Sequence, residues 1–180
     1  MNPSYVRIRL PLADAMARYS AWVAVAAVGP AVEVSLADAV RLACDEHGRW
    51  LGSALFVYHC DGWTVFEDLS GHHGAVSAQG WRSLAGDEPL VYAGYNDAIG
   101  YGALVVVEHG EVQREYLCDT SDPSANVDRG ELPPHRGRPV QAWTDVAGFV
   151  EDDVLVASPP ARGLLWLHVR GPSAGWHGQG

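Results

Sequence analysis

The chain has 180 residues, of which 22 are acidic and 12 basic, so its formal charge is −10 at pH 7. Every basic residue is arginine, because the sequence contains no lysine. Hydrophobic residues make up 48 % and charged residues 19 %, a composition typical of a globular domain and not of a disordered chain. The length predicts a single domain over residues 1–170, followed by a flexible tail over residues 171–180.

The acidic charge argues against nucleic acid and against an anionic membrane surface as partners. Both need a basic patch, and here the arginines are scattered among acids. The apolar run at residues 21–28 is shorter than the ~20 residues of a membrane span, and no convincing signal-peptide cleavage site follows it. Three widely spaced cysteines without a C-x-x-C motif indicate reduced thiols, so we expect a cytoplasmic protein.

The first third of the chain predicts one strand and two helices. Residues 5–10 alternate apolar and basic side chains, as a half-buried strand does. Residues 12–19 predict a short helix, and the run 21–28 is either its continuation or a buried strand. Ser35 is a suitable N-cap for a helix over residues 36–47, where apolar residues recur at helical spacing.

The rest of the chain predicts hairpins, a long loop and two further helices. In order we expect a strand at 50–59, a strand at 63–67, a short helix that is capped by Ser77 and ends at Leu84, a strand at 90–95, strands at 103–108 and 111–118, a surface loop at 119–138, a helix at 145–153 and a strand at 163–169. The turns Asp61-Gly62 and His109-Gly110 have the glycine that tight hairpins prefer. This order predicts the α+β class: a mostly antiparallel sheet with helices packed on one face.

Two stretches of the sequence resemble a known group of proteins. The first is Asp61-Gly-Trp-Thr-Val-Phe-Glu-Asp-Leu-Ser-Gly71, and the second runs from Leu90-Val-Tyr-Ala-Gly-Tyr-Asn-Asp97 through residues 119–127 to residues 143–152. They resemble small bacterial proteins associated with the immunity proteins of toxin–immunity systems. The resemblance covers roughly half of the chain and implies a single α+β domain that works by binding. It transfers no functional residue, since neither stretch is a catalytic signature and the relatives are rich in lysine.

Acidic and aromatic residues near the end of the chain are candidates for binding a protein partner. Asp119, Asp122 and Asp128 lie in the predicted long loop, and Trp143 follows it. Acidic surfaces steer basic partners, and exposed aromatic side chains anchor interfaces. The alternative is that these acids are simply solvated and that the tryptophan packs in the core. We predict from them an immunity-type inhibitor that neutralises a protein partner such as a toxin.

A second set of residues suits a polar small molecule. Tyr95, Asn96, Asp97 and Tyr101 surround the turn after a strand, although Asn-Asp and Gly are equally what a bare turn requires. Together with Glu67 they are candidates for acid–base catalysis, which needs no cofactor. The alternative function is therefore a cofactor-independent lyase or cyclase of actinobacterial specialised metabolism, catalysing an elimination or a cyclisation.

The histidine pair His72-His73 lies in a glycine-flanked loop and is a candidate for binding a metal. Metal sites take ligands from several segments, whereas adjacent histidines on a loop often just face solvent. Asp68, Ser70 and His72 are close in sequence, but a catalytic triad is defined by its arrangement in space. The sequence has no phosphate-binding glycine motif. We therefore expect neither a metal nor a cofactor.

Overall fold

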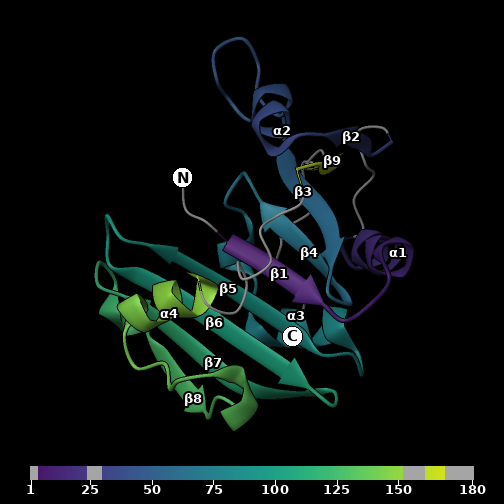
Figure 1. The fold of residues 1–180 in the computed structure, drawn as a ribbon. Coiled ribbons are helices and arrows are strands. Elements are labelled where there is room, and N and C mark those ends of the chain that lie inside the picture. Colours follow the sequence, from purple (N-terminus) through teal and green to yellow (C-terminus); the bar gives the residue numbers. More distant parts are fainter. Residues whose placement is uncertain (1–3, 24–29, 152–160, 169–180) are drawn as a thin grey trace.

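The protein is built on one twisted sheet (Figure 1). The computed structural model describes residues 4–23, 30–151 and 161–168. The sheet has nine strands in the order β2-β9-β3-β4-β1-β5-β6-β7-β8, and the neighbouring strands are antiparallel. The strands are β1 (Ser4–Ile8), β2 (Val32–Val34), β3 (Ser53–Cys60), β4 (Trp63–Asp68), β5 (Leu90–Asn96), β6 (Tyr101–Glu108), β7 (Glu111–Asp119), β8 (Val127–Gly130) and β9 (Gly163–His168).

Four α-helices of the described residues cover the sheet, and they divide between its two faces. They are α1 (Leu12–Val23), α2 (Leu36–Leu42), α3 (Ala78–Ala85) and α4 (Trp143–Phe149). The buried side chains of α1 and α3 pack in one apolar cluster, and those of α2 and α4 pack in the cluster on the opposite face. Figure 1 shows α4 and α3 on opposite sides of the strands β5 to β7. The α+β class and the antiparallel sheet are confirmed, but the helices do not gather on one face as expected.

The reason lies in the central strands, which are apolar on both sides. In β3, Leu55 and Val57 pack on the α1–α3 face, whereas Phe56 and Tyr58 pack on the α2–α4 face. A strand with two apolar sides must be covered twice, so one helical layer is not enough. Both apolar clusters extend across β5 and β6, whose side chains are buried along most of their length.

Both predicted hairpin turns are present. Asp61 and Gly62 have φ angles of 50° and 79°, and His109 and Gly110 have φ angles of 54° and 71°. Two successive positive φ angles are the mark of a type I′ turn, whose twist matches that of the strands it joins. The first turn joins β3 to β4, and the second joins β6 to β7.

Several element boundaries differ from the prediction. The first helix runs on to Val23, and residues 24–29 of the apolar run lie outside the described part of the chain. Helix α2 ends at Leu42 and not at residue 47, because the Asp45 carboxylate accepts hydrogen bonds from the backbone N–H groups of His47 and Arg49. These bonds build a turn in place of further helix.

The expected long loop contains regular structure. Residues 119–138 include two 3₁₀ turns, η2 (Pro123–Ala125) and η3 (Pro134–Arg136), and between them the edge strand β8. Helix α4 begins at Trp143, two residues before the predicted start, because the Asp145 carboxylate accepts from the N–H groups of Gln141 and Ala142. The predicted helix end at residue 153 and the predicted tail at 171–180 lie outside the described residues.

Two further properties follow from the described residues. None of their helices is both long and apolar enough to cross a membrane. The cysteines Cys44, Cys60 and Cys118 are free thiols.

Candidate functional site

The sheet separates the residues that the sequence suggests for a small-molecule site. Tyr95 packs against the apolar cluster of the α2–α4 face, whereas Tyr101 packs against that of the α1–α3 face. Between them, the side chain of Asn96 accepts the backbone N–H of Ala98 at 3.1 Å, and Asp97 is exposed in the turn. The two tyrosine side chains therefore pack on opposite faces, although both residues border the cavity described next, and Asn96 has the turn-forming role that was the alternative.

A cavity of about 260 Å³ lies at this end of the sheet. Strands β1, β5, β6 and β7 contribute to its wall, and the loop before η1 (His73–Ala75) closes one side. Strand pairing brings the wall together, because Ser4 is opposite Gly94 and Tyr101 is opposite Asp119. The lining residues are Ser4, Gly71, Gly74, Tyr92, Gly94, Tyr95, Ile99, Tyr101 and Asp119.

Two phenol groups and one carboxylate give the cavity its polar character. The hydroxyls of Tyr92 and Tyr101 both lie beside Gly74, where an added Cβ would approach them to 3.8 and 3.4 Å. Burial raises the pKa of both phenols, so they are protonated at neutral pH. Hydrogen bonds from the hydroxyl and backbone of Ser121 lower the pKa of Asp119, so this carboxylate is ionised.

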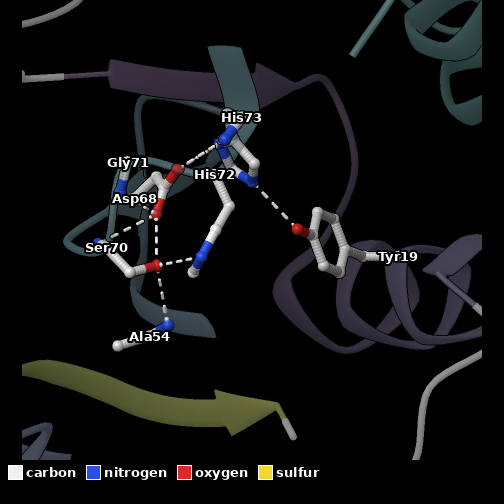
Figure 2. Close-up of polar contacts among 7 residues, drawn as sticks. All are labelled: Tyr19, Ala54, Asp68, Ser70, Gly71, His72 and His73. Atoms are coloured by element: carbon white, nitrogen blue, oxygen red, sulfur yellow. Dashed lines mark hydrogen bonds and ion pairs between the residues drawn. The ribbon is translucent and has the colours of Figure 1, made fainter. Parts of the chain in front are cut away.

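The loop that closes the cavity is organised by the buried carboxylate of Asp68 (Figure 2). Its Oδ1 accepts the N–H groups of Ser70 and Gly71, each at 3.0 Å, and its Oδ2 accepts the N–H of His73 at 2.7 Å. Burial acts to raise the pKa of Asp68, but the hydrogen bonds from His73 and Ser70 bring it below its ordinary value. Asp68 therefore stays ionised and fixes the path of residues 68–73.

Ser70 and His72 lie together, but their geometry is that of a structural contact. The Ser70 hydroxyl accepts the N–H of Ala54 at 3.1 Å, lies 2.9 Å from Asp68 Oδ1 and lies 2.7 Å from His72 Nδ1. Its one proton goes to the carboxylate, so the hydrogen on the short contact to His72 belongs to Nδ1 of the ring. An imidazole nitrogen that already carries a proton cannot accept one from the serine. This arrangement is not that of a Ser-His-Asp triad.

The two adjacent histidines face different partners (Figure 2). His73 is fully buried, and its Nε2 lies 2.9 Å from the hydroxyl of Tyr19 in α1. Burial lowers the pKa of His73, which keeps the ring neutral at pH 7. Within the described residues, no group of three or more His, Cys, Asp or Glu side chains is placed to hold a metal ion. The described residues therefore provide no further ligand that would make His72 and His73 a metal site.

A carboxylate lies among tyrosines on the other face of the sheet. Glu67 is opposite Tyr5 of β1, and its charge acts on both Tyr5 and Tyr58. Burial raises the pKa of Glu67 to about 7. The Tyr58 hydroxyl is buried and has no hydrogen-bond partner in the described structure. Tyr95 packs on the same face, so Glu67 shares an environment with Tyr95 and not with Tyr101.

The acidic residues proposed for partner binding all make local contacts. Asp119 accepts the backbone N–H and the hydroxyl of Ser121, and Asp122 accepts those of Ser124. Asp128 forms an ion pair with Arg114. Asp119 is partly buried, whereas Asp122 and Asp128 are exposed. Their carboxylates are thus held in position without being removed from the surface.

Trp143 is partly buried at the first turn of α4. Its backbone lies so close to β6 that a Cβ on Gly102 would come within 2.8 Å of its Cα. Trp143 therefore marks the place where α4 docks on the sheet.

A second hollow, of about 600 Å³, lies at the β8 edge of the sheet. It separates β8 from residues 131–141, and Arg114 lies at its base with 5 % of its surface exposed. The guanidinium donates to the carbonyls of Arg129 and Gly130, each at 3.1 Å, and to that of Val140 at 2.7 Å. We call this hollow the edge groove; it is lined by Arg114, Asp128, Gly130, Glu131, Leu132, Pro134, Gly137, Pro139, Val140 and Gln141.

Sequence reasoning missed the parts of both hollows that come from distant segments. Ser4 precedes the predicted first strand, and Tyr92 and Arg114 lie within predicted strands without being singled out. One signal was present: the Asp-x-Ser-Gly pattern at residues 68–71 is typical of a turn held by its own carboxylate.

No protein-family model, no curated protein and no solved structure matches this chain. We therefore infer the function from the chemistry of the two hollows and of Glu67 with its neighbouring tyrosines.

Proposed function

We propose that this chain is a cytoplasmic binding protein of the immunity type, which receives a basic segment of a protein partner, such as a toxin, in the edge groove. The observation that carries the proposal is the groove itself, a hollow of about 600 Å³ beside an edge strand. Its wall combines the apolar side chains of Leu132, Pro134 and Pro139 with the carboxylate of Glu131, while the second carboxylate, that of Asp128, is paired with Arg114. Such a wall suits an arginine or lysine, whose stem is apolar and whose end is charged.

The edge strand adds backbone groups to this surface. Strand β8 pairs with β7 on one side and is the last strand of the sheet on the other. Three of its four residues are exposed. An edge of this kind can pair with an extended segment of another chain, while the neighbouring groove selects its side chains.

The groove is held in shape before any partner arrives. Arg114 joins its two walls, since the same guanidinium bonds to carbonyls of residues 129 and 130 on one side and of Val140 on the other. The middle of the 131–141 segment is fixed by Arg136, which forms an ion pair with Glu108 at 2.8 Å. A preformed groove lowers the entropy cost of binding.

The charge around the groove favours a basic partner. Of the three arginines in residues 119–138, Arg129 is paired with Glu115 and Arg136 with Glu108, whereas Arg138 is exposed. Asp122 and Glu131 are exposed on the same segment, and the whole chain carries a formal charge of −10. Complementary charge raises the rate of association and makes it sensitive to salt.

The test is native mass spectrometry of the tagged protein captured from an extract of its own source cells. The wild type is compared with a double variant of two exposed groove residues, Glu131→Arg and Gln141→Arg. The matched control carries Glu46→Arg and Gln79→Arg, which make the same change in charge at exposed positions outside the groove.

We expect a stoichiometric protein partner with the wild type and the control, bound more weakly by the groove variant by about tenfold or more. Affinity for the wild type should fall as salt is raised. A toxin activity in the partner, neutralised by the wild type, would establish the immunity role. The proposal fails if no protein partner is retained, or if the groove variant binds as well as the control.

A second candidate function is favoured by Glu67, whose pKa of about 7 suits a general acid or base. In this alternative the chain is a cofactor-independent enzyme that acts on a polar small molecule at the α2–α4 face, with Tyr5, Tyr58 and Tyr95 around the carboxylate. Incubation with a small-molecule extract of the source cells tests it. A product made by the wild type and lost in Glu67→Gln supports this function, and an unchanged product pattern contradicts it.

A further inference from the structure

The cavity between the β1–β7 strand ends and the loop 71–74 has the size and lining of a ligand site. Its volume of about 260 Å³ is close to the lower end of the range for small-molecule pockets, roughly 300 Å³. We propose that it binds a small organic cation, a molecule of about that size that carries an amidinium, guanidinium or ammonium group. This site is separate from the edge groove, so the proposal goes beyond protein binding.

The charge of the lining selects a cation. Among the lining residues, Asp119 carries the one ionised side chain, and the others are tyrosines, a serine, an isoleucine and glycines. Ser121 and the N–H of Asp122 bond to Oδ1 of Asp119, so these contacts leave its second oxygen unused. A carboxylate without a basic neighbour in the wall repels anions and attracts cations.

A buried hydroxyl in the wall needs a donor. Ser4 lines the cavity and is 5 % exposed, and its hydroxyl is buried without a hydrogen-bond partner in the described structure. A buried polar group without a partner lowers stability. Amidinium and ammonium groups are rich in N–H donors and accept nothing. Such a group can donate to Ser4, to the Asp119 carboxylate and to the phenol oxygen of Tyr101.

The cavity is also preformed, because glycines leave its space open and Asp68 fixes its loop. A Cβ at Gly74 would lie 3.4 Å from the Tyr101 hydroxyl, so even one methyl group at this position would narrow the cavity. The loop carrying Gly71 and Gly74 is anchored by the hydrogen bonds of Asp68 shown in Figure 2. Binding of a ligand therefore requires little ordering of the wall, so its entropy cost is low.

The test uses three probes of nearly equal shape and different charge: benzamidinium (+1), benzamide (0) and benzoate (−1). Each is titrated into ¹⁵N-labelled protein, and amide shifts in two-dimensional NMR spectra give the affinity and the location of binding. We expect benzamidinium to shift residues 71–74, 94 and 101 in a saturable way, benzamide to bind about tenfold more weakly or worse, and benzoate not to bind.

Two variants and one control link the result to the cavity. Asp119→Asn removes the charge and keeps an oxygen that can accept from Ser121, so the turn survives; it should weaken benzamidinium binding about tenfold or more. Gly74→Ala should weaken it by filling space. Asp97→Asn removes the same charge from the exposed neighbouring turn and should change nothing. Equal binding of all three probes, no binding of benzamidinium, or unchanged affinity in Asp119→Asn would overturn the proposal.

Discussion

The side chains of Tyr95 and Tyr101 lie on opposite faces of the sheet, although the two residues stand at either end of one turn. Tyr95 belongs with Tyr5 and Glu67 on the α2–α4 face, whereas Tyr101 belongs with Tyr92 on the α1–α3 face. A sheet that is covered on both sides therefore offers two chemically different environments, one on each face. One has a carboxylate of raised pKa, and the other has an ionised carboxylate at the mouth of a cavity.

The raised pKa of Glu67 predicts how stability depends on pH. The folded-state value of about 7 lies above the ordinary 4.5, so the protonated form is favoured by folding. This contribution is fully present below pH 4.5 and is lost as pH rises through 7. Its size is up to about 3 kcal/mol. Urea unfolding between pH 5 and pH 8 should show this loss in the wild type and not in Glu67→Gln, and parallel curves would show that Glu67 has an ordinary pKa.

The close docking of α4 on β6 predicts an asymmetry between two glycines. Gly102→Ala places a Cβ 2.8 Å from the Trp143 backbone, which must move, so the free energy of unfolding should fall by about 1–3 kcal/mol. Gly148→Ala lies in α4 with no neighbour within 4 Å and should be neutral or stabilising by up to about 1 kcal/mol. Chemical denaturation measures both, and equal effects would rule out the close approach.

The buried guanidinium of Arg114 predicts local loosening of the edge groove. Arg114→Met removes the bonds to the carbonyls of Arg129, Gly130 and Val140, and we expect a loss of about 2–4 kcal/mol together with faster hydrogen exchange over residues 128–141. Arg41→Met, which breaks an exposed helix pair with Asp38, should cost less than about 1 kcal/mol. Exchange that stays slow over residues 128–141 would show that another contact holds the groove.

The carboxylate of Asp68 predicts a strong effect of a nearly isosteric change. Asp68→Asn puts an NH₂ group opposite N–H donors of Ser70, Gly71 or His73, so the free energy of unfolding should fall by about 2–4 kcal/mol. Asp61→Asn is the matched control at the other end of β4, because Asn accepts the positive φ of this turn as readily as Asp. Similar stability of the two variants would mean that the Asp68 network is dispensable.

Local chemistry allowed much of the fold to be predicted. The hairpin turns at Asp61-Gly62 and His109-Gly110 and the cap of α3 at Ser77 depend on a few neighbouring residues, and the structure confirms them. Helix α2 ended early because the Asp45 side chain formed a competing turn, a contact that helical periodicity does not contain. The second helical layer could have been expected from β3 and β6, which are apolar at nearly every position.

The sites depended on strand register, which no local pattern supplies. Asp119 reaches the cavity because it is opposite Tyr101, and Ser4 reaches it because β1 lies against β5. Shifting either pairing by one residue would turn the side chain to the other face. Candidate residues such as Asp119, Tyr101 and Glu67 were therefore recognisable by type, while their grouping into separate sites was not.

The position of β1 has a consequence for synthesis on the ribosome. Strand β1 lies in the middle of the sheet and precedes both of its partners in the chain, β4 and β5, which end at Asp68 and Asn96. Strand β1 therefore stays unpaired until β4 has been made, and its second side stays open until β5 has been made. It carries Arg7 and is followed directly by Arg9, and charge of this kind discourages pairing between nascent chains. Strand β1 joins the β3–β4 hairpin to the β5–β8 meander. We expect this long-range pairing to limit the folding rate.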